Sequence, residues 1–165
     1  MNYHNILHDN MTNGSGLRVV LFVSGCNHKC KNCQNPQTWD ITSGIKFDKE
    51  AKIEIFNELS KDYIDGITFS GGDPLHPVNR KNIIKLIKEI RKKYENTKSI
   101  WLYTGYSWNQ IKDLKGIELI DVLVDGEFHE SKKSPELPWV GSSNQRVINV
   151  KESLKQNKII IYKEK

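Results

Sequence analysis

The sequence predicts an α/β fold in which a parallel sheet forms an open, partial (β/α) barrel. Short runs rich in β-branched and aromatic residues alternate with longer amphipathic stretches, and such strand–helix–strand repeats form parallel sheets with right-handed crossovers. A closed eightfold barrel takes about 250 residues, whereas this chain has 165. No linker, internal repeat or low-complexity tract divides the chain, so we expect a single domain over residues 1–165.

Five strands are expected, each with the continuous apolar character of strands that are covered on both faces. In chain order they span residues 18–23, 66–70, 99–104, 121–125 and 146–150. The longest uninterrupted apolar run, residues 19–23, is far shorter than the roughly 20 residues of a membrane-spanning helix. The first ten residues also lack the basic cluster and apolar block of an export signal. We therefore expect no membrane partner and a cytoplasmic location.

Helical patterns fill the intervals between these strands. The first covers residues 49–61 behind Asp48, a preferred N-cap residue, and places Ile53, Phe56 and Leu59 on one side. Weaker helical patterns cover residues 107–114 and the stretch beyond residue 150. The Ser- and Pro-rich residues 131–138 predict a surface loop.

The second predicted helix starts near Asn79, after Pro77, and carries much of the basic excess of the chain. Its apolar stripe consists of Ile83, Ile87, Ile90 and Tyr94. The net charge is +5, and residues 80–98 contain eight basic and two acidic residues. Because apolar residues recur there at helical spacing, the basic residues are best explained as a solvated helix face, and we expect no nucleic-acid partner. Charge alone does not exclude an acidic protein partner.

All three cysteines, Cys26, Cys30 and Cys33, lie within eight residues directly after the first strand. An odd, clustered set without an export signal argues against disulfides, and thiolates prefer zinc, copper(I) or iron–sulfur centres. Structural zinc sites and ordinary clusters take four protein ligands, so a non-cysteine residue, a partner chain or a small molecule must complete this site. One alternative is a Cys3His zinc-binding interaction module. Its fourth ligand would come from His4, His8, His28, His76 or His129.

The Cys-x3-Cys-x2-Cys run resembles the motif of the radical S-adenosylmethionine enzymes, in which three thiolates hold a [4Fe-4S] cluster and S-adenosylmethionine chelates the fourth iron. Further segments resemble the activases of glycyl-radical enzymes, and more narrowly those that act on the anaerobic ribonucleoside-triphosphate reductase. They are residues 13–18, 22–26, 71–77, 101–106, 124–126 and 141–147. Two positions depart from the family: Asn32 replaces a frequent aromatic residue, and Ser15 replaces a frequent proline.

The resemblance implies that the three cysteines bind the [4Fe-4S] cluster and that the edge around Gly72 binds the methionyl amino group of S-adenosylmethionine. Gly-Gly-Asp-Pro alone is also an ordinary strand-to-helix turn, but ligands of parallel sheets bind at the carboxyl ends of the strands. The expected cofactor-binding residues are Asn32, Cys33, Gln34, Gly71, Gly72, Asp73, Thr104 and Asp125. For His28 and Lys29, inside the cysteine loop, solvation is the favoured interpretation. The roles of Arg18 and Arg146 stay open: either residue could contact a partner or pair with an acidic residue, and Arg146 could also meet the carboxylate of the cofactor.

The resemblance also implies an activity, that of an oxidoreductase of class EC 1.97.1. Reductive cleavage of S-adenosylmethionine would yield a 5′-deoxyadenosyl radical that generates a glycyl radical on the large reductase subunit. A flavodoxin-like protein would donate the electron in an anaerobic cytoplasm, and no side chain of the chain is expected to act as acid, base or nucleophile. The alternative within the family is an activase of a formate-lyase type enzyme. Whether the free protein is a homodimer stays open.

Overall fold

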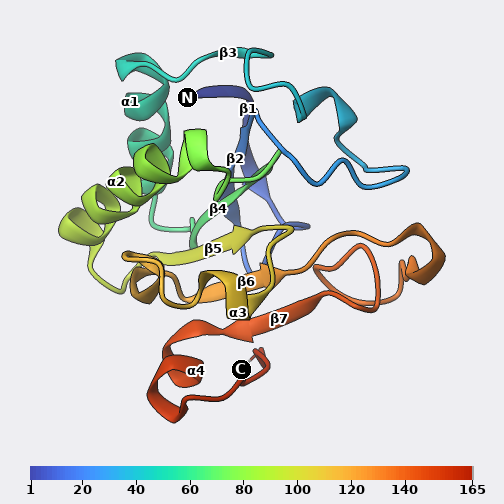
Figure 1. Ribbon diagram of the computed structural model, residues 1–165. Coiled ribbons are helices and arrows are strands. Elements are labelled where there is room, and N and C mark those ends of the chain that lie inside the picture. The colour runs from blue at the N-terminus through green and yellow to red at the C-terminus, as the bar shows by residue number, and fades with distance from the viewer. Residues whose placement is uncertain (165) are drawn as a thin grey trace.

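The computed structural model describes residues 1–164 and contains one seven-stranded sheet (Figure 1). The strands are β1 (Asn2–Asn10), β2 (Arg18–Val23), β3 (Ile45–Lys46), β4 (Gly66–Gly71), β5 (Ser99–Tyr103), β6 (Val122–Asp125) and β7 (Arg146–Asn149). The helices are α1 (Lys49–Leu59), α2 (Pro77–Tyr94), α3 (Trp108–Ile111) and α4 (Val150–Gln156). Short 3-10 turns are η1 (Pro36–Thr38), η2 (Ile117–Leu119) and η3 (Glu130–Lys132).

The strand order is β3-β1-β2-β4-β5-β6-β7. The four central strands, β2, β4, β5 and β6, are parallel as predicted, with bounds within one residue of the expected ones. β1 pairs antiparallel with β2 and β3, and β7 pairs antiparallel with β6. Over the described residues β3 and β7 are the two edges, so the sheet is open, as expected.

The prediction of an all-parallel sheet is therefore wrong at both edges. β1 was not expected at all, because its burial pattern alternates irregularly and the polar residues within it interrupt any apolar run. The direction of β7 has a different cause. A parallel neighbour needs a crossover, usually a helix, and the segment between β6 and β7 contains only the short turn η3. The chain therefore returns beside β6 in the opposite direction.

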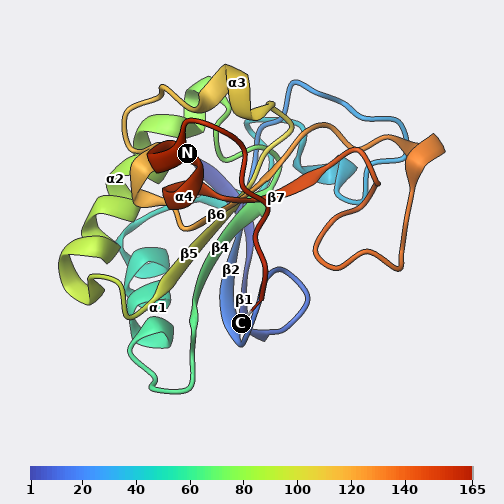
Figure 2. The same ribbon diagram turned by 90° about the horizontal axis from the view of Figure 1, so that it is seen from below.

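Helices α1 and α2 lie on one face of the sheet (Figure 2). The Asp48 side chain caps α1 by accepting from Ala51 N at 2.9 Å, as predicted. The buried side of α1 includes Ala51, Ile55 and Leu59, whereas Ile53, which was expected on that side, is exposed. The helix ends at Leu59, two residues earlier than predicted.

Helix α2 begins at Pro77, two residues before the expected start. His76 is its N-cap, and Nδ1 of this residue accepts from Val78 N at 3.2 Å. Proline suits the first helical position because its missing N–H would have no partner there. Of the predicted stripe, Ile83, Ile87 and Ile90 are fully buried, and Tyr94 is partly buried against the same core.

The two later helices lie within the weaker predicted patterns. α3 spans only four residues of the expected stretch 107–114, and α4 confirms a helix beyond residue 150. Asn149 caps α4 by accepting from Glu152 N at 3.1 Å. No helix within residues 1–164 combines the length and apolar character needed to cross a membrane.

The other face of the sheet carries a separate apolar cluster of Trp101, Val122 and Val124. The C-terminal segment beyond α4 runs along this face (Figure 2). It pairs with β7, since Asn149 N donates to Ile160 O and Tyr162 N donates to Val147 O, both at 2.8 Å. The Tyr162 ring lies 5.1 Å from that of Trp101, in an edge-to-face arrangement.

Candidate functional site

A cleft of about 270 Å³ lies where the parallel strands end. Its wall includes the last residues of β4, the residues directly after β5 and β6, and the loop that follows β2. This is the edge at which open α/β sheets bind their ligands. All three cysteines contribute to the wall, as do Gly71 and Gly72. The fold therefore brings the predicted metal ligands and the predicted S-adenosylmethionine-binding edge to one place.

The cysteine loop leaves β2 through Gly25, whose φ of +103° is closed to most other residues. Gly25 N donates to Thr38 O at 2.7 Å, and Cys26 N donates to Trp39 O at 3.0 Å. These two bonds fix the base of the loop against the chain that returns from it. Within the loop Cys33 N donates to Cys30 O at 3.1 Å, which closes a tight turn between the second and third thiols.

The three thiols are free and partly buried. Burial raises the pKa of Cys26 and of Cys30, and a bound metal would offset this by stabilising the thiolates. Asn35 N donates to Cys33 Sγ at 3.4 Å, the kind of contact that adjusts a cluster potential. Three soft sulfur donors in one cleft therefore fit a [4Fe-4S] cluster held by three protein ligands.

The histidine within the loop is not directed at a sulfur. His28 Nε2 lies 2.9 Å from Asp73 Oδ2 and Nδ1 lies 2.9 Å from Glu127 Oε1. The hydrogen bond to Asp73 raises the pKa of His28 against the opposing effect of burial, and Glu127 adds to the increase. Among residues 1–164, no three or more His, Cys, Asp or Glu side chains converge on the position of a single metal ion, whereas a [4Fe-4S] cluster binds each thiolate at a different iron.

Gly71 and Gly72 lie in the cleft wall, and both are required by close packing of the backbone. A Cβ on Gly71 would lie 2.6 Å from Val23 N, and one on Gly72 would lie 2.6 Å from Gly25 O. Gly72 N donates to Val23 O at 2.8 Å. The end of β4 is thus held directly against the end of β2 and the base of the cysteine loop.

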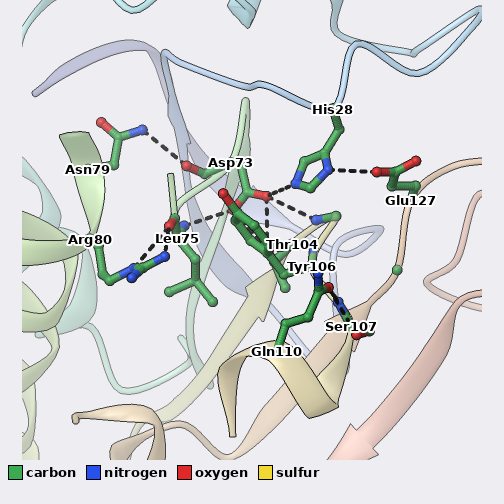
Figure 3. A network of polar contacts seen from close by, with 12 residues as sticks. His28, Asp73, Leu75, Asn79, Arg80, Thr104, Tyr106, Ser107, Gln110 and Glu127 are labelled. Atoms are coloured by element: carbon green, nitrogen blue, oxygen red, sulfur yellow. Dashed lines mark hydrogen bonds and ion pairs between the residues drawn. The ribbon is translucent and has the colours of Figure 1, made fainter. Parts of the chain in front are cut away.

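Asp73 lies behind this wall with an exposed fraction of 1%, and Figure 3 shows the polar contacts around it. Its carboxylate accepts from Leu75 N at 2.8 Å, from Thr104 Oγ1 at 2.9 Å and from Gly105 N at 3.0 Å, besides its contact with His28. Thr104 lines the cleft, but its hydroxyl donates to Asp73. Asp73 therefore joins the ends of β4 and β5 to the cysteine loop.

Asp125 is equally buried, at 1% exposure, and is held from two sides. It accepts from Trp108 N at 2.7 Å and from Arg146 Nε at 3.0 Å. This hydrogen bonding raises the pKa of Arg146. The structure thus pairs Arg146 with an acidic residue of the same chain.

The predicted site residues fall into three groups. The cleft wall contains Cys26, Cys30, Cys33, Gln34, Gly71, Gly72 and Thr104. Asp73 and Asp125 lie behind it, and the exposed Asn32 donates its side-chain N–H to Glu130. The interpretation of His28 as solvated is wrong, since its side chain is 10% exposed, whereas Lys29 is exposed as expected.

Several wall residues were not predicted from the sequence. They are Thr12, Asn13, Trp39, Tyr103, Glu127, Phe128, Trp139 and Gln145, with other residues between them. Glu127 and Phe128 follow β6 almost directly, so their place beyond a strand end could have indicated them. The aromatic wall residues carry no comparable local signal.

Comparison with known proteins agrees with this site. A family described as a 4Fe-4S single cluster domain matches residues 12–148. The chain is 45% identical over 151 residues to the anaerobic ribonucleoside-triphosphate reductase-activating protein of Escherichia coli K12, covering 89% of this chain and 97% of the relative. The protein of the same name from phage T4 is 43% identical over 147 residues, covering 89% and 93%. This chain belongs to the anaerobic ribonucleoside-triphosphate reductase-activating proteins.

Membership of this activating-protein family confirms the resemblance identified from the motifs. A further member, from Haemophilus influenzae, is 39% identical over 149 residues, which are 88% of this chain and 96% of the relative. The matched segment 12–148 contains the cysteine loop and every residue of the cleft wall. Helix α4 and the C-terminal segment that covers β7 lie beyond it.

Proposed function

We propose that this protein is a radical S-adenosylmethionine oxidoreductase that activates an anaerobic ribonucleoside-triphosphate reductase by generating a glycyl radical on it. The observation that carries the proposal is the convergence of three free thiols and the Gly71–Gly72 edge on one cleft. The names of the relatives and the 4Fe-4S family support it. When bound, the cluster would supply one electron that splits S-adenosylmethionine into methionine and a radical able to take a hydrogen atom from a glycine of the reductase.

The residues of the chain bind and orient in this proposal. Cys26, Cys30 and Cys33 would hold three corners of the cluster, which leaves one iron for the amino and carboxylate groups of S-adenosylmethionine. The backbone at Gly71 and Gly72 can approach the methionyl group closely because neither residue has a side chain. Positioning of this kind is the main contribution of a protein to cofactor chemistry.

The open sheet supports a protein substrate. We take it as the partial barrel of the radical S-adenosylmethionine enzymes, with β3 and β7 as its unjoined edges over the described residues. A segment of the reductase carrying the glycine would have to reach the cleft from outside, and a closed barrel would not admit it. A flavodoxin-like protein would supply the electron.

Anaerobic purification and reconstitution test the proposal, with Cys30→Ala as the informative variant and Ser131→Ala, at an exposed serine, as the control. We expect iron and sulfide in the wild type and the control, cleavage of S-adenosylmethionine, and a glycyl-radical signal on the added reductase in electron paramagnetic resonance. Cys30→Ala should lose the cluster signal and both activities. A wild type that holds zinc without iron, or a fully active Cys30→Ala, would contradict the proposal. A formate-lyase type enzyme offered in place of the reductase should acquire no radical.

A further inference from the structure

His28 makes contacts that its exposed neighbours in the cysteine loop do not share. Asn27 and Lys29 are exposed, whereas the His28 imidazole lies between two carboxylates (Figure 3). Asp73, after β4, lies 2.9 Å from Nε2, and Glu127, after β6, lies 2.9 Å from Nδ1. One side chain of the cysteine loop therefore reaches the ends of two strands that are separated by β5.

The end of β5 closes the third side of the imidazole. The Tyr106 ring meets it edge to face, with the ring centroids 4.7 Å apart. Gly105 leaves the space that the imidazole fills, because a Cβ there would lie only 2.4 Å from His28 Cδ2. The ring is thus positioned by contacts from the ends of β4, β5 and β6.

We propose that His28 is a positioning residue that keeps the three thiols in register with the Gly71–Gly72 edge. This inference rests on the proposed function and deepens it. The base of the cysteine loop is tied to that edge by the backbone, since Asp73 N donates to Gly25 O at 2.7 Å. Between Cys26 and Cys30, His28 supplies the side-chain tie.

The backbone contacts at the loop base and the side-chain contacts of His28 should have separate effects on cluster assembly and on S-adenosylmethionine binding. Without His28, the loop still carries all three cysteines and its backbone base, so a cluster can still assemble. The cluster would then no longer be held at a fixed place relative to the edge that receives S-adenosylmethionine. Loss of residues that orient metal ligands typically costs 10- to 100-fold in metal affinity or activity; because the loop base is intact here, we expect a loss of this order in S-adenosylmethionine binding.

The test uses reconstituted wild type and His28→Ala, with His8→Ala as a matched control. His8 also contacts two carboxylates, Glu54 at 2.7 Å and Glu58 at 3.7 Å, but on α1, away from the cleft. We expect His28→Ala to retain iron and sulfide and to bind S-adenosylmethionine about tenfold more weakly in an equilibrium titration. The change that S-adenosylmethionine causes in the electron paramagnetic resonance spectrum of the reduced cluster should also diminish. His8→Ala should match the wild type in all three measurements.

A substitution at Gly105 displaces the imidazole without deleting it. Gly105→Ala should force the His28 ring out of its place and weaken S-adenosylmethionine binding similarly. If both changes act through the same ring, Gly105→Ala combined with His28→Ala should bind no more weakly than the weaker-binding single variant. His28→Gln keeps one hydrogen bond and most of the volume, so we expect an intermediate affinity; it replaces His28→Ala should the alanine variant fail to fold.

Three outcomes would overturn the positioning role: unchanged affinity in the His28 variants, additive losses in the double variant, or a loss of iron that accounts for the weaker binding. A wild type that assembles no cluster or binds no S-adenosylmethionine would instead overturn the proposed function. Failure of the positioning role is therefore distinguishable from failure of the proposed function, because the former is seen only in the variants and the latter already in the wild type.

Discussion

At the scale of single residues, the guanidinium of Arg18 is a buried cation whose hydrogen bonds within residues 1–164 all go to uncharged oxygens. It is 0% exposed and lies on the face of the sheet opposite α1 and α2, 5.4 Å from the centre of the Trp101 ring. Its five hydrogen bonds go to carbonyl or hydroxyl oxygens of Ser15, Ile67, Thr68 and Ser99 at 2.8–2.9 Å. Burial lowers the pKa of Arg18 to about 10, so the group is charged at neutral pH. Of the two roles left open by the sequence, pairing with an acidic residue is therefore not found within residues 1–164.

Arg18→Lys should destabilise the protein by about 2–4 kcal/mol, because an ammonium has three donors, cannot reproduce the planar fork and leaves buried oxygens unpaired. Urea unfolding measures the difference. Arg80→Lys is the control, since Arg80 is partly exposed and the two hydrogen bonds of its guanidinium within residues 1–164 both go to Leu75 O; it should cost less than about 1 kcal/mol. Equal effects of the two substitutions would contradict the importance of the buried guanidinium.

At the scale of elements, Asp121 joins two helices and a strand at the start of β6. It accepts from Arg91 of α2 at 2.5 Å, from Lys151 of α4 at 2.7 Å and from Ile100 N of β5 at 2.7 Å. Burial alone would raise the pKa of Asp121, but the bonds from Lys151 and Arg91 outweigh it and the pKa is lowered. The carboxylate therefore contributes to stability in its ionised form.

A group whose pKa is lower in the folded state stabilises the protein above its unfolded pKa, about 3.9 for aspartate. This contribution is lost as the pH falls through the folded value. Asp121→Asn should therefore lower the free energy of unfolding by about 1–2 kcal/mol at pH 7, and the difference from wild type should shrink below pH 4. The exposed Asp113→Asn is the control and should show no such convergence. A difference that stays constant down to pH 3 would contradict this account.

The elements also show which parts of the fold the sequence patterns predict. β2, β4, β5 and β6 were predicted closely because strands buried on both faces carry continuous apolar runs. β1 was missed because polar residues interrupt its apolar positions, so it carries no such run, and the direction of β7 is set by its connection rather than by its own residues. In the cleft, the cysteines and glycines stand out by spacing and type. Whether a carboxylate at a strand end faces the cleft, or lies behind it as Asp73 does, depends on tertiary contacts that local patterns do not contain.

At the scale of the whole molecule, the C-terminal segment covers one edge of the open sheet. It pairs with β7 and places Tyr162 against Trp101 and Trp139. An uncovered strand edge offers unpaired N–H and C=O groups to other chains. The segment therefore protects both the edge of β7 and the aromatic cluster beside it.

A chain that stops after Asn157 should be less stable than wild type and should associate as its concentration rises. Urea unfolding and analytical ultracentrifugation measure the two effects. A chain that stops after Tyr162 keeps the pairing with β7 and serves as the control, with smaller changes in both measurements. A monomeric, equally stable protein ending at Asn157 would show that the segment does not protect the edge.

The order of the strands has a consequence for how the molecule assembles. After β2, each of β4, β5, β6 and β7 is added in turn at the same growing edge, so no later strand has to be inserted between two that are already joined. Contacts between strands that follow one another keep the required chain closures short. The cleft nevertheless takes its wall from residues as far apart as Thr12 and Gln145. The strands can thus begin to pair early during synthesis. The cleft at the strand ends is complete only when nearly the whole chain has left the ribosome.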